Sequence, residues 1–117
     1  MDFEICDVEY TVVLADDFSV AEITPELIFT ATRDQTLVAS VNIDHLEMIP
    51  SFRVAARAGN NRVMIRSFRI FNPRIRQPED PEGVKIYALE LQLASSVDCF
   101  KSHSKELTIT PSGAGPT

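Results

Sequence analysis

The chain has 117 residues, a length that suits one domain with its own hydrophobic core. Hydrophobic residues make up 44% of it and charged residues 24%, which is ordinary for a globular protein. Its four glycines are too few to build a glycine-rich phosphate loop, so the composition argues against a nucleotide-dependent enzyme. The net charge of −6, taken alone, argues against a free-standing nucleic-acid binder.

The first half of the chain alternates apolar and polar side chains at residues 8–15, 27–33 and 36–44. This period predicts strands with one buried face, and the second and third segments are close enough to form a hairpin. Residues 45–59 fit both the strand and the helix period. We favour a short helix there, because alanine and arginine promote helices, and keep a strand as the alternative.

The second half begins with a predicted strand at residues 62–72, whose alternation changes phase near Ser67 as a β-bulge would require. Three prolines and three acids mark residues 73–83 as a connecting loop, and residues 84–93 again alternate as a strand. Residues 94–104 are weakly helical or irregular. A short edge strand is expected at 106–110.

These elements predict an all-β fold with one short helix. We expect a single domain over residues 1–110 and a disordered tail at 111–117. The favoured architecture is a small five-stranded Greek-key barrel. An antiparallel β-sandwich remains the alternative, because both architectures produce short alternating strands.

The ends and the cysteines of the chain bear on its location. The acidic N-terminus lacks the pattern of a secretory signal, and no apolar run approaches the roughly 18 residues of a membrane span. Cys6 and Cys99, the two cysteines, are interpreted as buried thiols in a reducing compartment. We therefore expect an intracellular protein, cytoplasmic or nuclear, without a membrane partner.

Charge is sorted along the chain. Residues 1–48 hold eleven acids and one arginine, residues 49–78 hold seven arginines and no acid, and residues 79–117 hold six acids and three lysines. With a bulge at Ser67, one outward face would carry Arg62, Met64, Arg66, Arg69 and Phe71. Cationic forks beside an aromatic ring are typical of surfaces that bind single-stranded nucleic acid.

Residues 59–72, the loop that follows them and residues 86–93 resemble the end of an OB-fold domain of the replication protein A type. In that family a glycine precedes a strand of spaced apolar residues ending near a phenylalanine, and a strand rich in tyrosine and leucine follows the loop. The resemblance covers about half of the chain. It implies an OB barrel that binds single-stranded nucleic acid or scaffolds a complex, with Arg62, Arg66, Arg69 and Phe71 at the matching positions.

Signals for catalysis and for metals are weak. Cys99 and His103 have a C-x₃-H spacing, but zinc needs further ligands, and Cys6 and His45 are the only other soft candidates. Ser102 and Lys105 match an S-x-x-K spacing without the other motifs of that catalytic family. We therefore predict no catalytic residue, no metal, no cofactor and no enzymatic activity.

The sequence thus favours a non-catalytic module that binds single-stranded nucleic acid or belongs to a nucleic-acid maintenance complex. The predicted contact residues are Arg53, Arg57, Arg62, Arg66, Arg69, Phe71, Arg74 and Arg76. In one alternative, these arginines pair with the acids of the N-terminal half across neighbouring strands. In the other, the basic face docks on a protein partner or on the acidic face of a second copy, which would make the chain a self-assembling structural subunit.

Overall fold

The computed structural model describes residues 2–76, 86–96, 99–111 and 113–114, all of which lie in strands or in their connections. One sheet, here sheet A, contains β1 (Phe3–Leu14), β2 (Val20–Ala31), β5 (Gly59–Met64) and β6 (Phe68–Phe71). The other, sheet B, contains β3 (Gln35–Ile43), β4 (Leu46–Ala56), β7 (Ile86–Ser96), β8 (Cys99–Thr110) and β9 (Gly113–Ala114).

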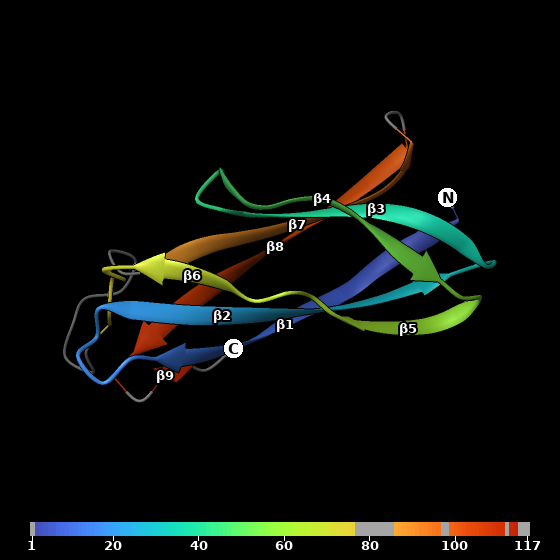
Figure 1. The fold of residues 1–117 in the computed structure, drawn as a ribbon. Helices are drawn as coiled ribbons and strands as arrows, with labels where there is room; N and C mark the ends of the chain where they lie inside the picture. Colours follow the sequence, from blue (N-terminus) through green and yellow to red (C-terminus); the bar gives the residue numbers. More distant parts are fainter. Residues whose placement is uncertain (1, 77–85, 97–98, 112, 115–117) are drawn as a thin grey trace.

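Every strand pair is antiparallel, and the two sheets lie face to face (Figure 1). Sheet A has the order β1-β2-β5, with β6 continuing the edge beside β2, and sheet B has the order β4-β3-β7-β8-β9. The all-β class is confirmed. The predicted five-stranded barrel is wrong, because the sheets do not close on one another, and the β-sandwich alternative is correct.

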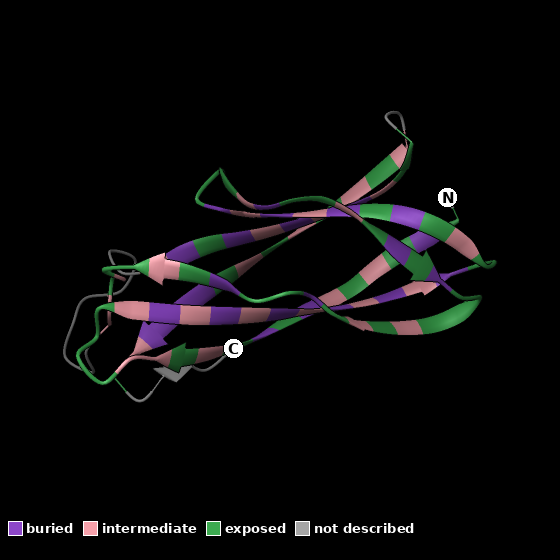
Figure 2. Cartoon of the chain, in the orientation of Figure 1, coloured by how far each residue is buried: buried purple, intermediate pink, exposed green. Residues whose placement is uncertain are grey.

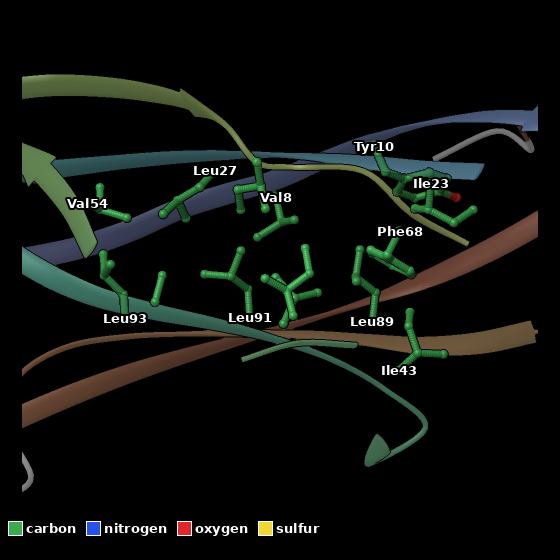
Figure 3. Packing of buried hydrophobic residues seen from close by; sticks show 14 of the residues in the cluster. Val8, Tyr10, Ile23, Leu27, Ile43, Val54, Phe68, Leu89, Leu91 and Leu93 are labelled. Atoms are coloured by element: carbon green, nitrogen blue, oxygen red, sulfur yellow. The ribbon is translucent and has the colours of Figure 1, made fainter. Parts of the chain in front are cut away.

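The hydrophobic core fills the space between the two sheets. Buried and partly exposed residues alternate along β2 and β7, so each strand turns one row of side chains inward (Figure 2). Figure 3 shows Val8, Ile23 and Leu27 of sheet A facing Leu89, Leu91 and Leu93 of sheet B. The alternation seen in the sequence therefore describes a buried face on both sheets.

The connectivity resembles that of immunoglobulin-like sandwiches. Strands β1, β2 and β5 form one sheet, and β3, β7 and β8 form the centre of the facing sheet. Tyr87 supports this likeness. It lies at the start of β7, and its hydroxyl accepts a hydrogen bond of 2.7 Å from the backbone N–H of Arg74, upstream in the chain. A tyrosine tied back to the preceding connection in this way is a hallmark of such folds.

The predicted helix at residues 45–59 is wrong, because most of this segment forms β4. Asp44 and His45 have φ values of 49° and 68°, which is the backbone of a tight two-residue hairpin turn. The turn sends β4 back along β3, where Ile49 and Val54 reach the core. Burial on a neighbouring strand outweighs a helix propensity worth a few tenths of a kcal/mol per residue.

The predicted phase change near Ser67 is confirmed. The five steps from Val63 to Phe68 lie opposite only four steps of β2, from Leu27 to Ile23, so one extra residue is accommodated. As a result Ile65 and Phe68 are both buried despite their opposite phases.

The remaining predicted segments have mixed outcomes. The strands predicted at 8–15, 27–33 and 36–44 coincide for most of their length with β1, β2 and β3. Residues 94–104 are not helical where they are described, because they complete β7 and begin β8. Much of the loop at 73–83 and of the tail at 111–117 lies outside the described residues, although Gly113–Ala114 pairs with Ile109 and Thr110.

Candidate functional site

The outward face predicted for residues 62–71 forms in part: the register places Arg62, Met64, Arg69 and Phe71 on the outer face of sheet A, whereas Arg66 lines a groove between the two sheets. Its five predicted residues, Arg62, Met64, Arg66, Arg69 and Phe71, are all exposed. The two apolar members, Met64 and Phe71, have 67% and 71% of their surface exposed. The extra residue near Ser67 is what keeps Arg69 and Phe71 on the same outer face as Arg62 and Met64.

Two arginines of this face, Arg62 and Arg69, are paired with acids of β1 and β2. Arg62 Nη1 lies 2.5 Å from Glu26 Oε1 and 3.7 Å from Glu9 Oε2. Arg69 Nε lies 3.6 Å from Glu22 Oε2. The acid-rich first strands and the arginine-rich segment thus compensate each other within sheet A, as in the cross-strand alternative.

The other predicted arginines lie elsewhere. Arg53 is exposed on β4 of sheet B, and Arg57 follows the end of that strand. Arg76 donates its backbone N–H to Ile109 O at 2.8 Å. The eight predicted contact residues are therefore divided between both sheets and their connections, and they do not form one continuous face.

Arg74 belongs to a compact polar cluster with Asp44 and Tyr87. Its guanidinium lies 3.9 Å from the centre of the Tyr87 ring and is paired with the Asp44 carboxylate. The other carboxylate oxygen of Asp44 accepts the backbone N–H of Ala88 at 2.8 Å. Partial desolvation alone would lower the pKa of Arg74, but hydrogen bonds to Tyr87 and Asp44 and the Asp44 charge raise it above its ordinary value.

A shallow depression of about 370 Å³ adjoins this cluster. Asp44, Ala88, Ser104, Lys105 and Glu106 contribute to its walls. Lys105 Nζ is already held by Asp7 Oδ1 at 3.3 Å, so the uncompensated charge of the depression comes from Glu106. The depression is open to solvent and therefore suits a ligand that lies on the surface.

The outer face of sheet B continues from this depression as a band of short polar side chains. We call it the polar track, and it consists of Ser40, Asn42, Glu90, Gln92, Ser102 and Ser104. The strand register places Ser40 beside Gln92 beside Ser102, and Asn42 beside Glu90 beside Ser104. Asn42 Nδ2 donates to Glu90 Oε1 at 3.4 Å.

An apolar row borders the polar track at its far end. Val38 pairs with Ala94, and Ala94 pairs with Phe100, whose side chain is 52% exposed. Sequence reasoning identified the polar phase of residues 36–44 and 84–93 but attached no function to it. The missing information was the register, because only the pairing of β3, β7 and β8 brings these three polar rows together.

The described residues contain no group of three or more histidines, cysteines or acids that could hold a metal ion. Cys99 is partly buried, whereas Cys6 is exposed at an irregularity of β1 and is not the buried thiol expected from the sequence. In the part of the chain that the structure describes, no helix has the length and apolar character needed to cross a membrane.

No family model and no curated protein matches the sequence. Among solved structures, the fold is similar to part of the exo-chitosanase CsxA of Amycolatopsis orientalis, with a TM-score of 0.74 and 11% identity over 92% of this chain and 13% of that chain. A Parabacteroides merdae β-glucuronidase is similar with a TM-score of 0.64 and 14% identity, again over 92% of this chain and 13% of that chain. At sequence identities this low, the structural similarity establishes the fold alone.

The prediction of a nucleic-acid-binding module is wrong. The similar structures are parts of glycosidases, and three of the arginines expected to meet phosphate are occupied by carboxylates of this chain. The sequence predicted an uncompensated basic surface because the arginines follow one another along the chain without intervening acids. Strand pairing places them beside the acids of β1, β2 and the β3–β4 turn.

Proposed function

We propose that this chain is a non-catalytic β-sandwich module of a carbohydrate-active protein and that it binds oligosaccharides along the polar track. The observation that supports it most is the similarity to part of an exo-chitosanase at a TM-score of 0.74 over 92% of this chain. The chain spans only 13% of the length of that enzyme. A supporting role beside a separate catalytic part is therefore the natural expectation.

The chemistry of the polar track suits sugar hydroxyl groups. A sugar presents many hydroxyls, each of which donates and accepts hydrogen bonds. Ser, Asn and Gln side chains also do both, and the Glu90 carboxylate accepts. Phe100 and Val38, at the apolar end of the track, can cover the C–H face of a sugar ring.

The charges around the track favour an amino sugar over a uronic acid. Among the described residues, Glu90 and Glu106 along the track form no ion pair, while Lys105 is held by Asp7. Arg53, also without an ion pair there, lies beside Val38 at the apolar end of the track. The net charge of −6 acts in the same direction at longer range. A glucosamine unit, which carries an ammonium group near neutral pH, would meet these carboxylates favourably.

The same face is poorly suited to hydrolysis. Glycosidases place two carboxyl groups on either side of the scissile bond, one of them acting as an acid. Glu90 and Glu106 project from neighbouring rows of one sheet face, so they lie on one side of any bound sugar. We therefore expect binding without bond cleavage.

Isothermal titration calorimetry with a glucosamine hexamer tests this function. We expect a weak, saturable interaction that falls with added salt, and weaker binding of the N-acetylated hexamer, which lacks the positive charges. The double variant Gln92→Ala/Phe100→Ala should lose at least about tenfold in affinity. The matched control Thr11→Ala/Val13→Ala, on the outer face of sheet A, should bind like the parent protein.

Two outcomes would contradict the proposal. One is the absence of binding at millimolar hexamer, or an equal loss in the control variant. The other concerns catalysis: release of p-nitrophenol from p-nitrophenyl-β-D-glucosaminide that disappears in Glu90→Gln would show that the module is itself an enzyme.

A further inference from the structure

One long edge of the sandwich is left open. β4 ends sheet B, and β5 with β6 ends sheet A on the same side. We call β4 and residues 59–71 the open edge. Between its two halves lies a groove of about 410 Å³, lined by Ile49, Pro50, Ser51 and Phe52 on one side and by Ile65 and Arg66 on the other.

The groove has an apolar floor. Ile49 and Ile65 are buried members of the core, and the partly buried Phe52 packs against that core. The floor therefore offers a place for one or two apolar side chains of a ligand.

Two arginines of the open edge, and a third just after β4, form no ion pair among the described residues. Among the residues that the structure describes, no ion pair involves Arg53, Arg57 or Arg66, whereas Arg62 and Arg69 on the outer face of sheet A are both paired. Arg66 lines the groove itself, whereas Arg53, the residue after Phe52 on β4, pairs with the exposed Val38 and projects on the outer face of sheet B. A protein of net charge −6 thus has, among its described residues, one arginine without an ion pair in the groove and another on the outer side of the adjoining free strand.

The backbone of β4 adds a third feature. Within the described residues β4 hydrogen-bonds to β3 alone, so alternate backbone groups on its other side have no strand to pair with. An edge of this kind can accept an extended peptide as an additional strand. Pro50 has no N–H and interrupts the edge, which leaves residues 51–56 as the run available for pairing.

We infer that the open edge binds an extended, acidic segment of a partner protein. The segment adds a strand along residues 51–56. Its inward side chains place an apolar group in the groove that Arg66 lines, and its outward side chains present acids to Arg53 on the outer face of sheet B. Charge complementarity selects an acidic partner, and the free strand edge selects an extended one. The groove and the free strand edge are separate from the polar track, while Arg53 lies beside Val38, which borders that track.

Fluorescence anisotropy with a labelled ten-residue peptide of alternating glutamate and isoleucine tests this inference. We expect binding in the micromolar range at low salt, and at least a tenfold loss in the double variant Arg53→Glu/Arg66→Glu. Arg69→Glu, on the outer face of sheet A, is the matched control and should bind as the parent does. Methylation of alternate backbone nitrogens of the peptide should also abolish binding, because it removes the strand hydrogen bonds.

Several results would overturn the inference. These are no binding of the parent peptide at low salt, an equal loss in Arg69→Glu, or equal affinity for oligoglutamate, which has the charge without the apolar side chains. A homodimer in light scattering that Arg53→Glu/Arg66→Glu dissociates would also overturn it, because the edge would then pair with a second copy. Loss of sugar binding in calorimetry, with peptide binding intact, would affect only the proposed function.

Discussion

The two long edges of the sandwich differ in the side-chain contacts that join their two sheets. Where β1 meets β8, Glu4 is paired with Lys101 at 3.2 Å, and Asp7 lies 3.3 Å from Lys105 and 3.7 Å from His103. At the open edge, within the described residues, no ion pair or side-chain hydrogen bond joins β4 to β5 or β6. We call the β1–β8 side the closed edge.

This difference teaches how one small sandwich can combine stability with a binding surface. Exposed ion pairs each contribute about 0–1 kcal/mol to the free energy of unfolding. The pairs at the closed edge therefore serve mainly to hold β1 in register with β8. Within the described residues, no such pair joins the two halves of the open edge, which retains backbone groups of β4 without a strand partner and Arg53 and Arg66 without an ion pair. The core beneath both edges supplies the stability.

The largest expected effect tests the core beneath the closed edge. Leu107 on β8 is 0% exposed, and Leu107→Ala should lower the free energy of unfolding by about 2–5 kcal/mol through lost burial and a residual cavity. Met64→Ala at the open edge, where 67% of the side chain is exposed, should change it by less than about 0.5 kcal/mol. Urea denaturation measures both. Equal losses would show that the open edge is packed as firmly as the closed one.

A smaller effect is expected from a hydrogen bond that crosses the closed edge. The buried backbone N–H of Thr108 donates to the hydroxyl of Tyr10 at 3.2 Å. Tyr10→Phe leaves this donor without its acceptor and should cost about 1–3 kcal/mol. Hydrogen exchange should show faster exchange of the Thr108 amide. An unchanged rate would mean that the Tyr10 hydroxyl contributes nothing to holding the edge.

The smallest expected effect concerns pH. Partial desolvation alone would raise the pKa of Asp7, but the Val8 N–H, a hydrogen bond from Lys105 and the charges of Lys105 and His103 lower it below 3.8. The folded state therefore gains stability that is fully present above the unfolded pKa and is lost as the pH falls through the folded pKa. Because Asp7 is about half exposed, the gain is below about 1 kcal/mol.

Asp7→Asn should accordingly flatten the dependence of unfolding free energy on pH as the pH falls below about 4, the unfolded pKa of an aspartate. Urea titrations across this range measure the slope, with Glu22→Gln on the outer face of sheet A as the comparison. A slope identical to that of the parent protein would show that the closed edge does not bind the Asp7 carboxylate in solution.

Much of the local structure was predictable from the sequence. The alternation of Leu37, Ala39, Val41 and Ile43 correctly indicates the buried face of β3, and the phase change near Ser67 correctly indicates an extra residue. Residues 45–59 were misread because Asp44 and His45, which form the tight turn, are not the usual turn glycines. The turn becomes evident only when β4 is seen to pair with β3.

The candidate sites were less predictable. The exposed face around Arg62 and Arg69 was foreseen, but its acidic partners Glu26 and Glu22 lie some 36 to 47 residues away in the chain. The polar track needs the register of β3, β7 and β8, which no local pattern specifies. Both sites depend on contacts between strands that are distant in sequence.

The sequence by itself determined the all-β class, the inward and outward phase of most strands, and the separation of acids from arginines along the chain. These properties follow from side-chain period and composition, which are local. Only the tertiary structure decided that the sheets form a sandwich and that Arg62, Arg69 and Arg74 meet acids, whereas Arg53, Arg57 and Arg66 meet none among the described residues. The reason is physical: strand pairing joins residues far apart in the chain, so charge compensation is a property of neighbours in space.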